Sequence, residues 1–435
     1  MRFDRSLELY EEARRLIPGG SQTNSKRPQH YAYGAYPIYA KHAQGCRIED
    51  VDGNRFIDLT MAFGPIVLGY GYPRVQEAIR RQLEHGTIAG LMFEAEVEAA
   101  RIFTETVPCA EMVRFLKGGG EATAAAARIA RAFTGRELIL NSGYRGWPDV
   151  WAAAHPLSKG VPSVLKETIR NFPFNDIPRL DRLLNEHKSQ VAAVILEIPA
   201  VEPHDGYLQA VRDLAHKHGA LLIMDEVVTG FRLAPGGAQE RYGVIPDLAC
   251  FAKAMANGMP VSAVAGRADV MKVAEDLLIT VTYGGEALSL AACVATVSEL
   301  RERPVNEHLW SVGAELRDGL NASAQRHGVP FESTGPAPMP LMRFDLADKS
   351  EADRVWTFFL QEMAARGVLM RRGGWNLVTY SHTREDIRIV LGAADQVFGA
   401  LKPLLGSPQL ARALKTTEVG SVAAGAVRSF VKEPA

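Results

Sequence analysis

The chain has 435 residues, 47% of them hydrophobic, and is long enough for two domains around a large core. Its 49 basic and 50 acidic residues give a formal net charge of −1, which removes any overall electrostatic argument for nucleic acid or acidic membranes as partners. The four cysteines show no Cys-x-x-Cys spacing, so neither a disulfide framework nor a metal site is expected.

The first sixty residues predict a helix, a loop and a hairpin. Residues 1–15 alternate charged and apolar positions at helical spacing and carry no apolar signal core, which favours a cytoplasmic protein. Residues 17–28 are rich in Pro, Gly, Ser and Asn and predict a long loop. Residues 46–59 place alternating apolar residues around an Asp-Gly-Asn turn, which predicts a β-hairpin. We expect residues 1–60 to join a small domain.

Residues 61–304 are expected to form a large domain. Apolar residues four apart predict a helix over 73–84. Further along, strand-like runs alternate with helical ones, and alternation of this kind predicts an α/β fold with a doubly wound, mostly parallel sheet flanked by helices. The strand-like runs are residues 112–116, 137–140, 191–196, 220–224 and 261–265.

The remainder predicts a smaller α+β domain over residues 305–405. Amphipathic patterns at 308–324 and 351–366 favour helices, and residues 340–344 favour a short strand. Residues 406–435 have weak periodicity and are expected to form a C-terminal extension, either docked or partly ordered. No stretch reaches the roughly 20 apolar residues that span a bilayer, so no membrane partner is expected.

Asp225 and Lys253 form the most informative pair in the sequence. Asp225 follows a continuous apolar run, at the end of a strand where open α/β sheets bind ligands. A buried carboxylate is costly unless it meets a cation or several donors, and a pyridinium nitrogen can be that cation. Lys253 supplies an amine that can form a Schiff base. Singly, these residues would be a loop anchor and a solvated cation; together they predict a pyridoxal site.

Other predicted strand ends add groups to the same edge. Gly118, Gly119 and Gly120 open a helix-prone run, whose backbone N–H groups and dipole can bind phosphate, although glycines there can also serve a tight turn. Tyr144 can stack on a planar cofactor or be a core aromatic. Glu197 can bring a second acidic group to the site or cap a loop.

An ordered set of motifs resembles the class III pyridoxal-phosphate aminotransferases of fold type I, closest to the glutamate-1-semialdehyde 2,1-aminomutase-like branch. The motifs are Ile17-Pro-Gly-Gly20, Val51-Asp-Gly-Asn54, Gly64-Pro-Ile-Val-Leu-Gly69, Asp225-Glu-Val-Val-Thr-Gly-Phe-Arg232, Tyr242-Gly-Val-Ile-Pro-Asp247 and Gly258-Met-Pro260. The resemblance implies an aminotransferase that moves an amino group from an amino acid or amine donor to a carbonyl acceptor, by a ping-pong aldimine/ketimine mechanism.

The resemblance also implies roles for single residues. Lys253 would be the Schiff-base lysine and proton carrier, and Asp225 the partner of the pyridine nitrogen. Val227 and Tyr144 would lie on the two faces of the ring, with Gly118, Gly119 and Gly120 in the phosphate loop. Thr282 would be lent to the phosphate by the neighbouring subunit, which requires a homodimer with shared active sites.

Several positions depart from the family pattern. The phosphate loop has three glycines where a serine or threonine is usual, so we expect looser cofactor binding. Arg145 stands where histidine is common, and Glu286-Ala287 stands where the aminomutase has Asn-Pro, which argues against the heme-pathway aminomutase itself. An intramolecular aminomutase on the same scaffold and a catalytically idle cofactor-binding protein are the alternatives. A nicotinamide dehydrogenase is disfavoured because the glycines lack the Gly-x-Gly-x-x-Gly pattern.

Basic residues provide candidates for binding a substrate carboxylate, since a guanidinium can hold a carboxylate with two hydrogen bonds. The region 371–376 in the predicted small domain is the preferred specificity region. The substrate candidates are Arg27, Arg145, Arg372 and Trp375, with Lys26, Arg232 and Arg371 as further possibilities.

Overall fold

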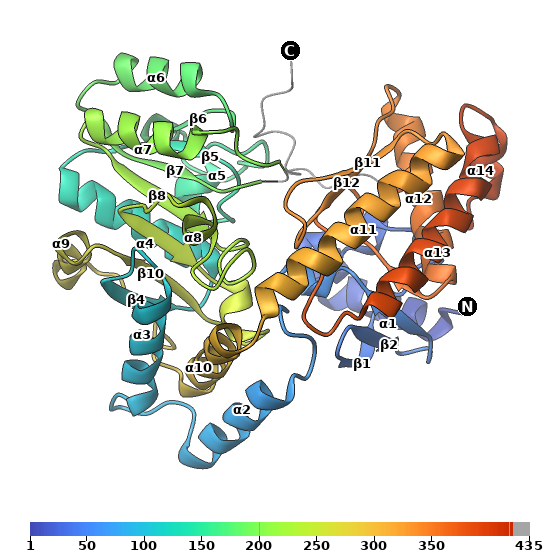
Figure 1. Cartoon of the computed structure of the whole chain (residues 1–435), viewed down its shortest axis with the longest axis horizontal. Helices are drawn as coiled ribbons and strands as arrows, with labels where there is room; N and C mark the ends of the chain where they lie inside the picture. Colours follow the sequence, from blue (N-terminus) through green and yellow to red (C-terminus); the bar gives the residue numbers. More distant parts are fainter. Residues whose placement is uncertain (200, 417, 421–435) are drawn as a thin grey trace. The chain divides into compact units, whose positions relative to one another are not determined.

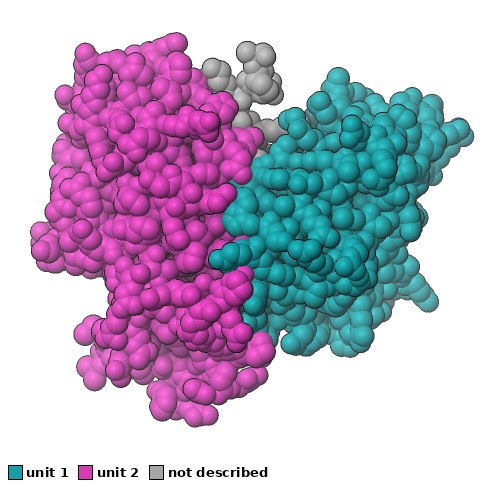
Figure 2. Space-filling view, in the orientation of Figure 1, with its two compact units in different colours: residues 1–63, 68–72, 307–426 teal, residues 64–67, 73–306, 427–435 magenta. Residues whose placement is uncertain are grey.

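The computed structural model describes residues 1–199, 201–416 and 418–420. The chain divides into two compact units, which Figure 2 colours separately. Unit 2 contains residues 64–67 and 73–306, and unit 1 contains residues 1–63, 68–72 and the described residues from 307 onward.

Unit 2 is built on a seven-stranded sheet with the strand order β4-β10-β9-β8-β7-β5-β6 (Figure 1). All its strands run in one direction except β10, which pairs antiparallel with β4 and with β9. The strands are β4 Met112–Leu116, β5 Leu138–Ser142, β6 Ile169–Asn171, β7 Val191–Leu196, β8 Leu221–Glu226, β9 Leu248–Phe251 and β10 Ser262–Gly266. The prediction of a mostly parallel sheet is confirmed; the short strands β6 and β9 were missed.

Helices cover this sheet, as α4 packs against β7, β8, β9 and β10 and α7 packs against β7 and β8 (Figure 1). The helices of unit 2 are α2 Pro73–His85, α3 Glu94–Thr106, α4 Gly119–Thr134, α5 Asp149–Ala152, α6 Ile177–Glu186, α7 Tyr207–Lys217, α8 Ala238–Tyr242, α9 Ala268–Met271 and α10 Ala287–Glu302. The small side chains of α4 let it lie close to the strands, where Ala122, Ala126 and Ala130 are fully buried.

The two faces of β8 carry different side chains. Leu221 and Ile223 belong to the core cluster that includes α4, and Asp225 follows them on the same face because side chains alternate along a strand. Glu226 therefore points to the opposite face, where its carboxylate accepts hydrogen bonds from the N–H groups of Ala238 and Gln239, both at 2.9 Å. This alternation places Asp225 on the face of the sheet that α4 covers.

Unit 1 combines a four-stranded sheet, in the order β1-β2-β3-β13, with a separate two-stranded sheet of β11 and β12. The predicted hairpin at residues 46–59 is confirmed as β2 and β3, and the predicted strand at 340–344 is confirmed as β12. The strands of unit 1 are β1 Ala40–Gln44, β2 Arg47–Asp50, β3 Arg55–Asp58, β11 Phe331–Thr334, β12 Leu341–Phe344 and β13 Val368–Leu369. Its helices are α1 Asp4–Leu16, α11 Val305–His327, α12 Lys349–Ala365, α13 Arg384–Leu401 and α14 Gln409–Ala413.

The predicted C-terminal extension, residues 406–435, lies in part outside the described residues. Its described part includes α14, which packs on α12, and Gln361 of α12 donates a hydrogen bond to the carbonyl of Ala413 at 2.9 Å. Elsewhere, all four cysteines are buried free thiols. Among the described residues, no helix combines the length and the apolar character needed to cross a bilayer.

Candidate active site

The carboxyl ends of the parallel strands bring the predicted site residues of unit 2 to one edge of the sheet. Asp225 is the penultimate residue of β8, within the strand and not after it as the sequence suggested. It pairs in register with Cys250 of the neighbouring strand β9, and Lys253 follows three residues later. Burial raises the pKa of Asp225, while Arg145, the N–H of Val227 and Lys253 oppose that rise. The carboxylate and the amine thus leave adjacent strands at the same edge.

Lys253 has an unusual backbone conformation. It begins the 3₁₀ turn Lys253–Ala256 with a φ of 46°, in the left-handed region that costs a non-glycine residue about 1–2 kcal/mol. Its side chain passes Gly64 so closely that a Cβ atom on that glycine would lie 3.0 Å from Lys253 Cδ. Strain of this kind persists where surrounding structure enforces it, and it concentrates at functional sites.

Two more charged residues surround Asp225. Arg145 Nη1 lies 3.0 Å from Asp225 Oδ2 and 3.4 Å from Glu197 Oε2. All three side chains are buried, with exposures of 1% for Arg145, 8% for Glu197 and 3% for Asp225. We call Arg145, Glu197 and Asp225 the buried charge cluster. Sequence reasoning placed Glu197 at this edge but not its pairing with Arg145.

The cluster strongly affects the proton affinity of Glu197. Burial raises the pKa of Glu197 to about 7, since a buried carboxylate loses its hydration; Arg145 opposes the rise and Asp225 adds to it. Arg145 was expected to be a substrate clamp, but the structure gives its guanidinium to these carboxylates and to the carbonyls of Ser142 and Tyr144. The Arg145 guanidinium therefore binds groups of the protein itself and does not fit the expected substrate clamp.

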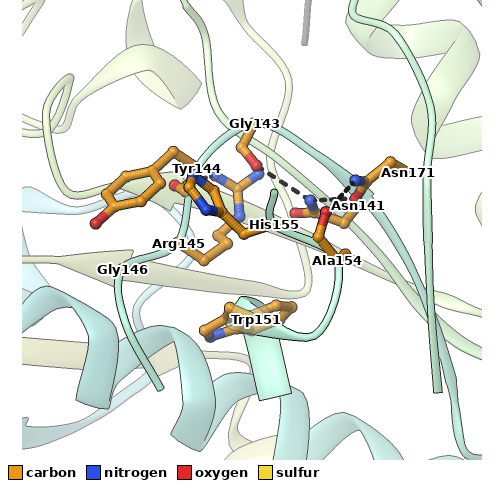
Figure 3. A pocket seen from close by; sticks show the side chains of 9 residues that line it. All are labelled: Asn141, Gly143, Tyr144, Arg145, Gly146, Trp151, Ala154, His155 and Asn171. Carbon is orange, nitrogen blue, oxygen red and sulfur yellow. Dashed lines mark hydrogen bonds between the residues drawn. The ribbon is translucent and has the colours of Figure 1, made fainter. Parts of the chain in front are cut away.

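The loop after β5 positions Tyr144 (Figure 3). The Tyr144 N–H donates to Glu197 Oε1 at 3.2 Å, and its half-exposed ring makes an edge contact with His155 at 6.2 Å between centroids. Gly143 has a φ of 116°, and a Cβ atom there would lie 2.6 Å from Glu197 Cγ. Only a glycine lets the loop approach Glu197 this closely. The half-exposed face of the Tyr144 ring is available for stacking.

The predicted phosphate loop opens α4. The Glu121 carboxylate accepts hydrogen bonds from the N–H groups of Lys117 at 2.9 Å and Gly118 at 3.0 Å. Gly119 and Gly120 are the first two residues of the helix, so their N–H groups have no partner within it and can serve an anion. A Cβ atom on Gly119 would lie 2.8 Å from Val227 Cγ1, so the loop approaches the end of β8 closely.

Sequence reasoning missed two contacts that hold this loop. Lys117 Nζ lies 3.0 Å from Glu286 Oε2, and Glu286 also caps α10 by accepting from the N–H groups of Leu288 and Ser289. Burial disfavours the ionised Glu286, but hydrogen bonds from Ser289 and Lys117 outweigh it and lower the pKa of Glu286. The Ser262 hydroxyl donates to the carbonyl of Gly118 at 2.9 Å. Thr282, expected to serve a partner subunit, is exposed.

The substrate candidates in unit 1 have different surroundings. The buried guanidinium of Arg372 donates to the carbonyls of His30, Tyr31 and Asp353 and to the hydroxyl of Thr357, so it is engaged in holding unit 1 together and does not fit the expected clamp. The guanidinium of Arg27 packs against Gly19, and Trp375 is half-buried with an isolated bridge to Leu341.

Arg371 is better suited than Arg372 to meet an external carboxylate. Its guanidinium carbon lies 5.1 Å from the centre of the Phe63 ring, and no carboxylate among the described residues forms an ion pair with it. Burial lowers the pKa of Arg371, with Tyr31 opposing, so an anion beside it would be stabilising. Within unit 1, Arg371 thus replaces its neighbour as the preferred candidate.

The groups at the sheet edge of unit 2 fit a phosphorylated pyridine aldehyde. The first N–H groups of α4 suit a phosphate, and the glycines admit it without side-chain obstruction. The buried charge cluster has two carboxylates and one guanidinium, which suits a ring that carries a proton. Lys253 supplies the amine that condenses with an aldehyde.

Comparison with known proteins agrees with this chemistry. The sequence profile of the family Aminotransferase class-III matches residues 30–392. The chain is 39% identical over 433 residues to glutamate-1-semialdehyde 2,1-aminomutase from Syntrophobacter fumaroxidans, covering 93% of this chain and 99% of the relative. It is 32% identical over 414 residues to 3-aminobutyryl-CoA aminotransferase from Cloacimonas acidaminovorans, with coverages of 93% and 99%.

Solved structures extend the same relationship to the fold. The chain matches the structure of the PLP internal aldimine form of FumI from Sphingopyxis sp. MTA144 with a TM-score of 0.87 and 30% sequence identity, covering 94% of this chain and 100% of that one. Because the family match and the structural match both run through nearly the whole chain, the protein belongs to the class III aminotransferases, enzymes of fold type I that depend on pyridoxal phosphate.

Proposed function

We propose that this protein transfers an amino group between an amino donor and a carbonyl acceptor, with Lys253 and Asp225 as its catalytic residues. The observation that carries the assignment is the pairing of β8 with β9, which brings Asp225 and Lys253 to the same edge of the sheet from adjacent strands. Pyridoxal phosphate, when bound, supplies an aldehyde that condenses with amines and a ring that withdraws electrons.

The residues of the chain divide the remaining work. Lys253 holds the cofactor and, once released by the substrate amine, carries a proton to and from the substrate carbon. Asp225 keeps the ring nitrogen protonated, and Val227 and Tyr144 pack on the two ring faces. Gly119 and Gly120 hold the phosphate through backbone N–H groups, and Gly118, whose N–H is donated to Glu121, belongs to the same loop.

The proposal is tested by single half-reactions with a panel of amino acids and amines. The absorbance of the bound cofactor should change on adding a suitable donor and return on adding a carbonyl acceptor, with one equivalent of keto product released in between. If no donor in a broad panel changes the absorbance of the fully loaded protein, an idle cofactor-binding protein is the better description.

An intramolecular aminomutase is the second candidate, favoured by the 39% identity to the Syntrophobacter fumaroxidans relative. Such an enzyme exchanges amine and carbonyl within one molecule and needs no added acceptor. One position argues against it: Glu286 follows Gly285, where the aminomutase resemblance implies asparagine. The Glu286 carboxylate accepts hydrogen bonds from Lys117 and from the first N–H groups of α10. Sustained turnover of glutamate-1-semialdehyde without any keto acid would select the aminomutase.

A homodimer with shared sites is part of the proposal. Segments 86–97 and 278–285 carry exposed apolar side chains, among them Leu91 and Met92 at 84% and Leu278 at 82%, and Glu96 and Ile279 are among the residues that line a hollow of ≈ 310 Å³. Apolar side chains that gather on a surface favour contact with a partner, and Thr282, in the second segment, is exposed. We infer that a second copy of the chain covers this surface.

Subunit mixing tests the shared site. Thr282→Ala should weaken cofactor binding, and Lys253→Ala should abolish turnover, whereas a mixed dimer of the two should regain one native site. No regain of activity, or a monomeric wild-type protein in light scattering, would contradict a shared site.

Four buried free thiols also support our inference of a cytoplasmic protein, where thiols stay reduced.

A further inference from the structure

The buried charge cluster contains two charged side chains, Arg145 and Glu197, besides the aspartate that is proposed to meet the ring nitrogen. Its two carboxylates and one guanidinium carry a net charge of −1 among buried side chains, and Lys253 is the next cation, which opposes the rise that burial causes in the pKa of both carboxylates. An uncompensated buried charge is unfavourable, so the cluster needs either one proton or one cation, which Lys253 or a bound ligand can supply.

Arg145 is fixed between the two carboxylates. Its Nη1 atom contacts Asp225 at 3.0 Å and the Tyr144 carbonyl at 2.9 Å, while Nη2 donates to the carbonyl of Ser142. Asp225 in turn accepts from the N–H of Val227 at 2.9 Å. The Asp225 carboxylate is therefore held from two sides and has little rotational freedom.

Glu197 has weaker support than Asp225. Its distance to Arg145 is 3.4 Å, and its one backbone donor, the N–H of Tyr144, lies at 3.2 Å. The close approach of Gly143 keeps it pressed into the cluster. Of the two carboxylates, Glu197 is therefore the one that takes up a proton when no other cation is present.

We propose that Arg145 and Glu197 together set the charge that the ring nitrogen of the cofactor meets, so that the site prefers a protonated pyridine ring. Arg145 is a positioning residue that fixes Asp225, and Glu197 restores the negative charge that Arg145 cancels. The inference rests on the proposed role of Asp225 and extends it to two residues that do not themselves carry out the amino transfer. The raised pKa of Glu197, caused first by burial and reduced by Arg145, is consistent with a proton that leaves when the ring cation arrives.

The test compares two ligands, pyridoxal phosphate and its analogue in which a CH group replaces the ring nitrogen. The ratio of their dissociation constants measures how strongly the site prefers the ring nitrogen, and it is independent of the phosphate and aldehyde contacts that both ligands make. The wild-type protein should prefer pyridoxal phosphate by about 100-fold, as expected for a buried charge-assisted hydrogen bond.

Glu197→Gln should lower this ratio by about tenfold, because it removes a nearby negative charge without changing the shape of the side chain. The double variant Arg145→Gln, Glu197→Gln should recover part of the ratio, since Asp225 alone then gives the site its one negative charge. If Arg145 and Glu197 had a purely structural role, each substitution would weaken the binding of both ligands by the same factor. The double variant would then bind both ligands more weakly than the single variant does.

Glu226→Gln is the matched control, since Glu226 is a buried carboxylate next to Asp225 on the opposite face of β8. Its ratio should equal that of the wild type even if the variant is less stable. An unchanged ratio in Glu197→Gln, or no recovery in the double variant, overturns the inference while leaving the role of Asp225 intact. A wild-type protein without any preference, or an Asp225→Asn variant that keeps it, overturns the role of Asp225 itself.

Discussion

The two ends of the proposed cofactor site are made from different groups. The ring end is the buried charge cluster of Arg145, Glu197 and Asp225, in which each charged side chain is held by another. The phosphate end is a loop of three glycines at the start of α4, where the backbone N–H groups of Gly119 and Gly120 have no partner within the helix. Charge is concentrated where the reaction needs it, and the binding end depends on backbone geometry.

The comparison shows two ways of recognising one ligand. Buried charges give a large discrimination between ring protonation states, but they are costly when the ligand is absent. Backbone N–H groups at a helix end give a weaker interaction that costs little in the empty protein. We therefore expect changes at the ring end to alter rate and stability, and changes at the phosphate end to alter cofactor affinity.

Removing Lys253 tests the premise that both ends serve one cofactor. Lys253→Ala should abolish turnover, because no amine is left to hold the aldehyde or to move the proton, while the phosphate end still binds the ligand. Lys253→Arg should be equally inactive although it keeps the charge. Steady-state assays and cofactor absorbance measure both effects, with Lys272→Ala, at an exposed position, as control. Activity in either Lys253 variant would contradict the proposed cofactor site.

Asp225→Asn tests the ring end directly. The rate of the half-reaction should fall by roughly 100-fold or more, because the neutral amide does not stabilise a protonated ring nitrogen. The affinity for inorganic phosphate at the other end should stay the same. Stopped-flow absorbance gives the rate, and a wild-type rate would reduce Asp225 to a structural residue at the end of β8.

The cost of the ring end should appear as a pH effect on the cofactor-free protein. Glu197 has a folded pKa of about 7, above its usual value, so its contribution to stability is present at low pH and is lost as pH rises through 7. Glu197→Gln lacks this loss. It should match the wild type near pH 5 and exceed it at pH 8.5, by a free energy of unfolding on the order of 3 kcal/mol at most. Thermal unfolding at the two pH values checks this, and equal pH slopes would contradict it.

The phosphate end should respond with the smallest effect. Gly118→Ser should tighten pyridoxal phosphate binding several-fold, which corresponds to about 1 kcal/mol of binding free energy. The serine adds a hydroxyl donor at a position where a Cβ atom meets nothing nearer than 3.9 Å. Gly118→Ala is the control and should change little. Gly119→Ala should instead weaken binding, because its Cβ atom would press on Val227 at 2.8 Å. Equilibrium dialysis distinguishes the three; tighter binding in Gly119→Ala would show that the loop is not where we place it.

Much of the fold was predictable because it depends on local pattern. The continuous apolar runs of β7 and β8 have the composition of buried parallel strands, and they appear where expected. Strand β9 was missed because four residues are too short to distinguish from a loop by periodicity. Strand β6, with three residues, was missed for the same reason.

The site was predictable only as far as strand ends reveal it. Asp225 and Lys253 lie next to apolar runs that form buried strands, so the sequence predicted them as site residues. Arg145 and Arg372 were expected to face substrate, but their partners lie up to 80 and 342 residues away in the sequence, and no local pattern reports such pairings. For an arginine, burial and partner decide the role, and both are properties of the folded chain.

The antiparallel strand β10 has a consequence for how the protein is made. Its pairing joins Ser262 to Leu116, so the edge of the sheet that carries the phosphate loop closes only after residue 266 has left the ribosome. Contacts this distant in sequence are slow to form and are completed late in folding. The glycine loop is thus synthesised long before the strand that anchors it.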